Sequence, residues 1–432
     1  MKKLFLILFI IAQASSIFAQ NQADVVKDLV IKNVSVISML TNDIKEHQDV
    51  VIKDGKISSI SNTKKGDYKN VLIVDGKGKY MMPSLADAHV HFPEDDTGMK
   101  RVMALYLVNG VTKLRSMRGD WEHIDWRNKY EKDGSVHPKL YLSPPAISRN
   151  YDLSVSQIEE FVKTSKERGF NFMKILSIKD ETVFAQFDSI AKEYNFPIGG
   201  HFPDNIGDDL IFNSLYNSFE HLGGLAGNPD VLESRLKLIK EKNIFICPTL
   251  SWYNIGSGRH SYDELRKLPG MASVPNATLE VWIDGTKKYR EKLGIEAYKE
   301  EVANELKALD KKYEVIKAIH KLGIPMLLSP DSSSKYMISG FDMVGEMELL
   351  KHADLTNYEI LKMATINFAN FFNEDYGVIE KGKAADFIIL KTNPLVDLNA
   401  LRKIEGLYFN NQFLDRKKLE TMRMSLLENF QN

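Results

Sequence analysis

The chain has 432 residues, of which 44% are hydrophobic and 27% are charged. These values are ordinary for a globular protein and exclude a disordered or low-complexity chain. The 57 Lys and Arg residues nearly balance the 58 Asp and Glu residues, which gives a formal net charge of -1. A nearly neutral chain has no surplus of positive charge for binding phosphates, so we expect a small-molecule substrate and no nucleic acid partner.

Residues 1–19 have the pattern of a signal peptide. Lys2 and Lys3 precede an apolar run at residues 4–12, and the small residue Ala19 suits cleavage directly after it. The apolar run is roughly half of the ~20 residues that a membrane-spanning helix needs. We therefore expect export to the periplasm or the extracellular space and no membrane span in the mature chain. A buried N-terminal helix is the alternative interpretation.

Short strands with alternating or β-branched residues come next, at residues 29–38, 49–60 and 71–74. Asp54-Gly55 divides the second of these stretches as a turn. Strand patterns return late in the chain, at residues 385–390 and 406–409. A sheet that begins before the central part of the chain is therefore expected to be completed after it.

The central part of the chain, residues 82–373, alternates brief apolar strands with longer helical patterns. Eight strands are predicted, at residues 86–90, 112–117, 139–143, 172–176, 197–201, 218–221, 244–249 and 325–329. Helical periodicity fills most gaps, for instance at 156–168, 182–194 and 232–242, and Gly169 and Asn243 mark two helix ends. Eight strand-helix repeats predict a (β/α)8 TIM barrel, in which catalytic residues gather at the carboxyl ends of the strands.

The longest connection, at residues 252–324, contains several Gly and Pro residues and ends in a charged helix predicted from about residue 279 to residue 320. Its Lys and Glu residues at helical spacing are typical of a solvated helix face. A lid over the barrel is the alternative interpretation.

The strongest local signal is a pair of histidines, His89 and His91, at the end of the first predicted barrel strand. Residues two apart on a strand point to the same side, so both imidazoles can be directed at one divalent metal ion. Further metal-ligating residue types follow later strands: His201 the fifth, His221 the sixth and Asp331 the eighth. Each histidine alone is more often a core or surface residue, but the set together predicts a metal centre.

Lys174 lies in the apolar strand segment 172–176, where a charged ammonium is costly to bury. Burial and nearby cations would lower its pKa, and the neutral amine can take up carbon dioxide to form a carbamate that bridges two metal ions. The alternative is an amine that reaches the barrel mouth. Asp331 emerges after the last strand, where its carboxylate can ligate metal and shuttle a proton.

Several ordered motifs resemble the metal-dependent amidohydrolase superfamily, in its imidazolonepropionase and Xaa-Pro dipeptidase (prolidase)-like branch. They lie at residues 54–57, 83–91, 109–115, 219–221, 329–331, 364–369 and 377–386. The resemblance implies a TIM barrel at residues 83–375. It also implies a small composite β-sandwich built from residues 24–82 plus 376–425.

The resemblance implies a role for each candidate residue. The four histidines match metal ligands, Lys174 matches a carbamylated bridging lysine, and Asp331 matches the metal-binding general base; the histidines are His89, His91, His201 and His221. The implied cofactors are one or two divalent metal ions, zinc first among them, and carbon dioxide as the lysine carbamate. The implied reaction is hydrolysis of a C–N bond in an amide, a cyclic amide or a dipeptide, with Asp331 as general acid and base.

Substrate recognition is assigned to Arg115 and Arg118 near the end of the second strand and to Tyr253 after the seventh, where they can bind a carboxylate. Surface or structural ion pairs are the equally weighted alternative. The sequence departs from the family pattern at Ser84, and at three positions expected around the substrate, which are Pro203, Pro330 and Val344.

Two other functions remain open. The same site can hydrolyse a lactone, an ester or a phosphotriester, because attack by hydroxide is common to all of these reactions. The three departures also allow a non-catalytic exported binding protein, although the complete ligand set argues against it. A homo-oligomer is a further expectation, since barrel enzymes of this kind often pair through helices, but no apolar heptad identifies an interface.

Overall fold

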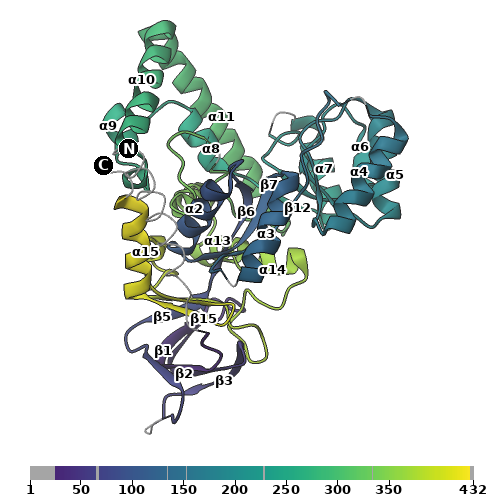
Figure 1. The fold of residues 1–432 in the computed structure, drawn as a ribbon. Coiled ribbons are helices and arrows are strands. Elements are labelled where there is room, and N and C mark those ends of the chain that lie inside the picture. Colours follow the sequence, from purple (N-terminus) through teal and green to yellow (C-terminus); the bar gives the residue numbers. More distant parts are fainter. Residues whose placement is uncertain are drawn as a thin grey trace, which may run out of the picture.

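The computed structural model describes residues 25–64, 68–133, 135–151, 153–226, 229–332 and 334–428. The predicted signal peptide lies outside these residues. Figure 1 shows a β-sheet at the bottom of the view, a projecting helix pair at the top and a helical lobe at the right. Within the described ranges, no helix combines the length and the apolar character needed to cross a membrane.

The sheet at the bottom of Figure 1 is built from both ends of the chain. Its strand order is β15-β14-β13-β5-β1-β2-β3, with β4 paired to β1. The strands are β1 (Leu29–Ile37), β2 (Ile44–Lys53), β3 (Lys56–Asn62), β4 (Leu72–Asp75), β5 (Tyr80–Pro83), β13 (Phe387–Leu390), β14 (Ile404–Phe409) and β15 (Gln412–Asp415). The antiparallel pairing of β13 with β5 joins the two segments. The composite sheet is therefore confirmed, and a sandwich of two sheets stays a prediction.

The turn between β2 and β3 is the one that the sequence predicts. Asp54 and Gly55 have φ angles of 48° and 71°, the left-handed values that suit a tight hairpin turn. A side chain at Gly55 would also collide with Asn411, because an added Cβ would lie 2.3 Å from its Oδ1. The backbone angle thus favours glycine here, and a Cβ would in addition require the Asn411 side chain to move.

Seven of the eight predicted barrel strands are present in the described residues, in two parallel sheets. One contains β6 (Leu85–His91), β7 (Val111–Arg118) and β8 (Lys139–Tyr141); the other contains β9 (Met173–Ile175), β10 (Ile198–His201), β11 (Tyr216–Glu220) and β12 (Phe245–Cys247). The eighth is only a bridge between Ile246 and Met326. Its short extent fits the flanking prolines Pro325 and Pro330, which cannot donate backbone hydrogen bonds.

Backbone hydrogen bonds connect the two parallel sheets at both edges. The Ile147 nitrogen donates to the Lys174 oxygen at 2.8 Å. On the other side, the Leu327 nitrogen donates to Ile246 at 2.9 Å and the Ala88 nitrogen donates to Leu328 at 3.0 Å. This neighbour order is the one that a closed barrel requires, while the strands remain divided between two sheets. The mixed α/β fold is clear, and barrel closure stays a prediction.

Helices follow most of these strands. They are α2 (Asp96–Leu107), α3 (Trp121–Asp133), α4 (Val155–Arg168), α5 (Glu181–Glu193), α6 (Asp208–Phe212), α7 (Pro229–Glu241), α8 (Leu250–Gly256), α9 (Tyr262–Arg266), α10 (Asn276–Leu293), α11 (Ile295–Lys321), α12 (Met343–Leu350), α13 (Asn357–Met363), α14 (Ile366–Phe372) and α15 (Arg416–Glu428). The predicted end at Gly169 is confirmed, since this residue caps α4 with a φ of 88°.

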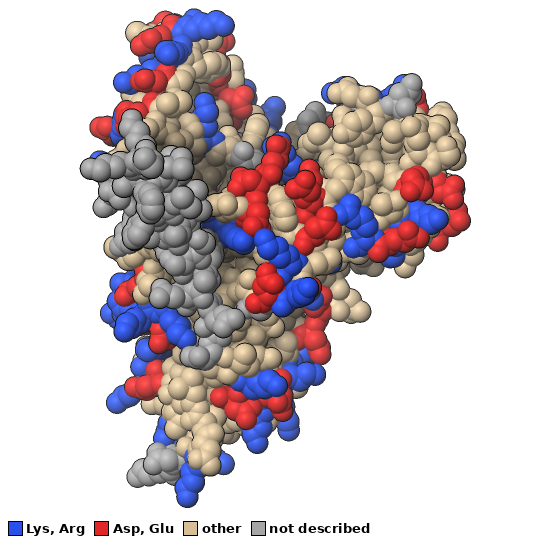
Figure 2. Space-filling view, in the orientation of Figure 1, with Lys and Arg blue, Asp and Glu red and all other residues tan. Residues whose placement is uncertain are grey.

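The long charged helix predicted from about residue 279 to residue 320 is wrong as a single element. Gly294 divides it into α10 and α11, with φ 83° and ψ 157°, values far from those of a helix. The pair projects from the rest of the molecule (Figure 1), and charges of both signs cover its outer end (Figure 2). Exposed ion pairs such as Lys299 with Glu296 fit the solvated face that the sequence predicts.

Candidate active site

Four histidines and one aspartate converge where the parallel strands end. The ring centroids of His89 and His91 are 5.3 Å apart, those of His89 and His221 are 5.0 Å apart, and those of His201 and His221 are 4.9 Å apart. Potential ligand atoms of His89, His91 and Asp331 all lie within 4.8 Å of one another. The structure thus brings the predicted histidines and aspartate together, and we call these five residues with Lys174 the candidate centre.

Three residues at this end of the strands have left-handed backbone angles. His221, Thr249 and Asp331 have φ angles of 65°, 53° and 54°, a region that residues with side chains rarely adopt and that is least expected for β-branched Thr249. Each of them follows the end of a parallel strand or of the bridge segment. Such strain clusters at functional sites, and here it turns the His221 and Asp331 side chains toward the other ligand candidates.

Burial keeps the imidazoles of the candidate centre neutral. It is the largest cause of the lowered pKa of each ring, and the charge of Lys174 lowers all four further. The pKa of His91 falls to about 3 and that of His201 to about 4, from an ordinary value of 6.5. Neutral imidazole is the form that ligates a metal ion, so these rings need not lose a proton first at neutral pH.

Lys174 lies on β9 with only 2% of its surface exposed. Burial lowers the pKa of its amine to about 8, against the opposing effects of the carboxylates of Glu220 and Asp331. The expected burial and lowered pKa are therefore found, and the amine does not reach solvent. Uptake of carbon dioxide by this amine stays a prediction.

A buried carboxylate that no sequence pattern had indicated holds His89. Glu220 accepts a hydrogen bond from Nδ1 of His89 at 2.9 Å and one from Nη1 of Arg115 at 2.7 Å. Because side chains alternate along a strand, Glu220 is expected to face away from its neighbour His221. His221 instead lies just past β11 in a left-handed conformation, so both residues reach the candidate centre.

The position of Arg115 favours the structural ion pair given above as the alternative to substrate binding. Its side chain is 0% exposed, and its guanidinium is held by Glu220 and by the Ser218 hydroxyl at 2.7 Å. The rings of Phe172 and Phe371 cover it at 4.5 and 4.9 Å. The residue count along β7 placed Arg115 near the strand end, whereas its side chain points into the interior and is closed off from solvent.

Comparison with known proteins identifies the family of this chain. Residues 150–416, which are more than half of the chain, match the family model described as the amidohydrolase family. The chain belongs to the amidohydrolase family. It is accordingly a hydrolase, as the resemblance of its motifs implied.

Solved structures share the fold of this amidohydrolase. A bottromycin amidohydrolase has a TM-score of 0.75 at 19% identity, covering 94% of this chain and 92% of that one. A Xaa-Pro dipeptidase with methionine bound in its active site has a TM-score of 0.66 at 15% identity, covering 90% and 100%. A prolidase complexed with N-methylphosphonate-L-proline has a TM-score of 0.66 at 20% identity, covering 90% and 100%. No curated protein sequence matches the chain.

The other two predicted substrate contacts of the amidohydrolase differ in their surroundings. Tyr253 on α8 is half-buried, and burial, followed by the charge of Asp331, raises its pKa. Arg118 pairs with Glu94 at 3.2 Å, and both side chains are mostly exposed. Arg118 thus has the surface ion pair given above as its alternative, and a substrate contact of Tyr253 stays a prediction.

Glu346 supports the helix that carries Tyr253. Its carboxylate accepts hydrogen bonds from the backbone nitrogens of Leu250 and Ser251, at 2.8 and 2.6 Å, at the first turn of α8. Burial raises the pKa of Glu346 to about 7. The carboxylate thus satisfies two donors at the start of a helix that otherwise lacks a side-chain cap.

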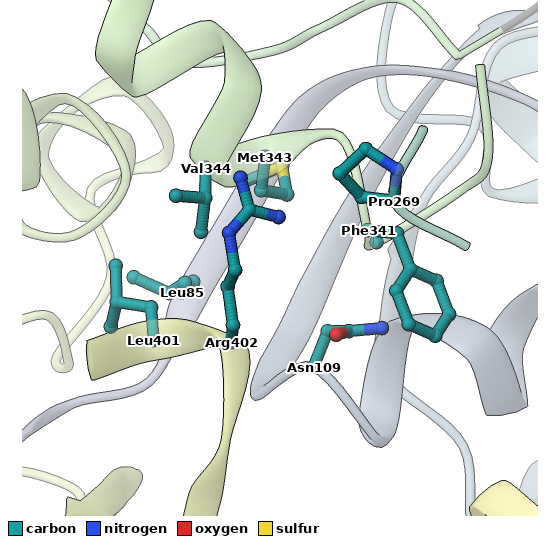
Figure 3. A pocket seen from close by; sticks show the side chains of 9 residues that line it. Leu85, Asn109, Pro269, Phe341, Met343, Val344, Leu401 and Arg402 are labelled. Atoms are coloured by element: carbon teal, nitrogen blue, oxygen red, sulfur yellow. The ribbon is translucent and has the colours of Figure 1, made fainter. Parts of the chain in front are cut away.

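Two cavities of the amidohydrolase are lined by different parts of the chain. One of about 290 Å³ is lined by Leu85, Val344 and Arg402 (Figure 3). Leu85 begins β6 and His91 ends it, so this cavity lies at the opposite end of the strand from the candidate centre. The position of Val344 in this cavity therefore does not fit the expectation that it surrounds the substrate. A cavity of about 310 Å³ lies among α8 to α11 and includes Trp252, the neighbour of Tyr253. The residues that line this second cavity include none of the candidate centre.

Proposed function

We propose that this amidohydrolase is an exported, metal-dependent enzyme that cleaves a C–N bond in an amide, a cyclic amide or a dipeptide. The observation that carries the proposal is the approach of His89, His91 and Asp331 to one another at the ends of the parallel strands. The prolidase-like folds of the similar structures support a small amide or dipeptide as substrate. The N-terminal pattern at residues 1–19 supports export to the periplasm or the extracellular space.

The residues present suit a divalent cation. The Nε2 atom of His91 is buried without a hydrogen bond among the described residues and lies 3.3 Å from Oδ1 of Asp331. Nε2 of His89 is 3.8 Å from the same oxygen. Two ligands of a tetrahedral zinc ion, each about 2.0–2.2 Å from it, are roughly 3.3–3.6 Å apart. His201, His221 and a carbamylated Lys174 would complete the set of ligands for one or two ions.

A cation bound by these residues would polarise the scissile carbonyl and lower the pKa of a water toward about 7. The carboxylate of Asp331 then accepts the proton of the attacking water and delivers it to the departing nitrogen. Tyr253, half-buried on α8, would contact the substrate. The products are a carboxylate and an amine.

The domain organisation belongs to the same proposal. A closed TIM barrel at residues 83–375 is supported by the hydrogen bonds from Ala88 to Leu328 and from Leu327 to Ile246. A separate composite β domain at residues 24–82 plus 376–425 is supported by the pairing of β13 with β5. In this arrangement the terminal sheet lies at the opposite end of the strands from the candidate centre.

Metal analysis of the purified protein and the variant Asp331→Asn test the proposal. We expect about one or two divalent ions for each chain, and a loss of turnover of about 10²–10⁴-fold in the variant, because proton transfer typically contributes that factor. Amides, dipeptides, lactones and phosphotriesters are screened in parallel. Protein without stoichiometric metal, or a variant with full turnover, would falsify the proposal, and preference for a lactone or phosphotriester would reassign the substrate.

A further inference from the structure

A chain of buried polar groups reaches His89 from behind the candidate centre. Arg115 donates to Oε1 of Glu220 at 2.7 Å, and Oε2 of the same carboxylate accepts from Nδ1 of His89 at 2.9 Å. The Ser218 hydroxyl accepts from Nη2 of Arg115 at 2.7 Å and donates to Oε1 of Glu220 at 2.9 Å. The four residues come from β6, β7 and β11, and each is at most 1% exposed.

Stability alone gives a poor reason for this arrangement. Removing an arginine and a glutamate from water is costly, and replacing a buried ion pair by apolar residues of similar volume is often neutral or stabilising. The neighbouring strand β10 also leaves room for the guanidinium at Gly199, where an added Cβ would lie 2.4 Å from Nη2 of Arg115. The interior is therefore shaped around a charged pair whose far end contacts His89.

The contact determines which nitrogen of His89 is available. A carboxylate only accepts hydrogen bonds, so Nδ1 of His89 carries the proton and Nε2 keeps its lone pair, directed toward Asp331 at 3.8 Å. The partner of His221 is different, because the hydroxyl of Thr249, 2.6 Å from Nδ1, can donate or accept. Among the described hydrogen bonds of the four histidines, only that of His89 is made to a carboxylate.

We propose that Arg115 and Glu220 are positioning residues that fix the tautomer and orientation of His89, so that its Nε2 atom is ready to bind the metal ion. This inference rests on the metal centre of the proposed function. Neither residue touches the reacting atoms. Arg115 acts only through Glu220, whose carboxylate it holds against the imidazole.

The variant Glu220→Gln tests the inference sharply. Arg115 and Ser218 both donate to Oε1, so the amide oxygen takes that place and the amide NH2 group faces Nδ1 of His89. The ring must then accept at Nδ1 and carry its proton on Nε2. We expect the affinity for Zn²⁺, measured by competition with a chromophoric chelator, to fall 10- to 100-fold. In ¹⁵N-labelled, metal-free protein, the His89 ring resonances should change from the Nδ1–H to the Nε2–H tautomer.

Two further variants separate positioning from a structural role. Arg115→Met/Glu220→Gln removes both charges and should fold, yet still bind Zn²⁺ at least 10-fold more weakly than the parent. Lys113→Met/Asp386→Asn removes the other buried ion pair of β7, whose contacts among the described residues include none of the candidate centre, and should change Zn²⁺ affinity less than twofold. If Glu220→Gln does not fold, the first double variant replaces it.

The outcomes distinguish this inference from the proposed function. A parent tautomer with its proton on Nε2, or parental Zn²⁺ affinity in the folded double variant, overturns the positioning role even if the enzyme hydrolyses amides. Conversely, the absence of amide turnover with tight, Glu220-dependent Zn²⁺ binding overturns the proposed function and supports the positioning role.

Discussion

Two buried ion pairs start from the same strand and end in different places. Lys113 and Arg115 are two residues apart on β7, so both side chains point to the same side. Lys113 pairs with Asp386, just before β13 of the terminal sheet, whereas Arg115 pairs with Glu220 beside His89. Burial of a charged pair is thus common to both regions. The two pairs differ in the further contact that each carboxylate makes. For Glu220 this contact is His89 of the candidate centre, which indicates a functional role.

The second contacts of Asp386 are structural. Its carboxylate also accepts hydrogen bonds from the hydroxyls of Ser84 and Thr112, and the Ser84 nitrogen donates to its backbone oxygen at 3.2 Å. These contacts attach the parallel strands to the terminal sheet. The pair also borders a cavity of about 500 Å³, while two phenylalanine rings cover Arg115.

The largest expected effect comes from breaking each pair singly. Arg115→Met leaves Glu220 charged in a closed interior and should lower the free energy of unfolding by about 3–5 kcal/mol. Lys113→Met should cost less, about 1–3 kcal/mol, since Ser84 and Thr112 still donate to Asp386. Urea denaturation measures the loss of unfolding free energy in both variants. A larger loss in Lys113→Met than in Arg115→Met would contradict this account of the two environments.

A smaller effect is expected from filling the space beside Arg115. Gly199→Ala brings a methyl group within 2.4 Å of the guanidinium and 2.8 Å of the Ser218 hydroxyl, so it should cost about 1–3 kcal/mol and weaken Zn²⁺ binding. Gly345→Ala on α12, where a Cβ meets nothing within 4 Å, is the matched control. It should be neutral or stabilising by up to about 1 kcal/mol. Equal costs for the two variants would refute the close-packing argument.

Acid should destabilise the chelator-treated protein through the candidate centre. The pKa values of His91 and His201 are about 3 and about 4 in the folded protein, below their ordinary 6.5. At a pH between the folded-state pKa values and 6.5, the unfolded chain binds more protons than the folded protein. The stability that the neutral rings contribute is therefore complete above pH 6.5 and is lost as the pH falls toward 4. Lowering the pH from 7 to 5.5 should cost about 1 kcal/mol for each imidazole.

Thermal unfolding at both pH values measures this loss. His201→Asn should reduce the pH dependence, whereas Lys113→Met/Asp386→Asn should keep it. A parent protein that is equally stable at pH 7 and pH 5.5 would show that the rings are not held neutral by burial.

The smallest effect is expected at the exposed end of β7. Arg118 pairs with Glu94 in solvent, and such pairs contribute about 0–1 kcal/mol. Arg118→Ala should therefore leave the free energy of unfolding within about 0.5 kcal/mol of the parent and change KM little for any substrate identified by the screen. A tenfold rise in KM would restore the substrate role that the sequence suggested for Arg118.

The sequence predicted the features that depend on local spacing. The two-residue separation of His89 and His91, the turn at Asp54-Gly55 and the helix end at Gly169 each follow from backbone geometry within a few residues. The gathering of His201, His221 and Asp331 also followed, because the carboxyl ends of parallel strands meet at one edge.

The features that the sequence did not predict depend on distant contacts or on single backbone angles. Glu220 is 105 residues away from Arg115 along the chain, and no local pattern indicates that they pair. Alternation along a strand would direct the side chains of Glu220 and His221 to opposite sides, but the positive φ of His221 lets both reach the candidate centre. Likewise, the helical periodicity of the sequence continues through Gly294, whereas the backbone angles of this residue divide the predicted helix into α10 and α11.

Anomalous diffraction from crystals of the purified protein, recorded at the absorption edge of its bound metal, tests the central claim most directly. We predict a peak about 2.0–2.2 Å from Nε2 of His89, Nε2 of His91 and Oδ1 of Asp331. A metal-replete protein with no peak among these three atoms, or with its ion bound elsewhere, would contradict the account.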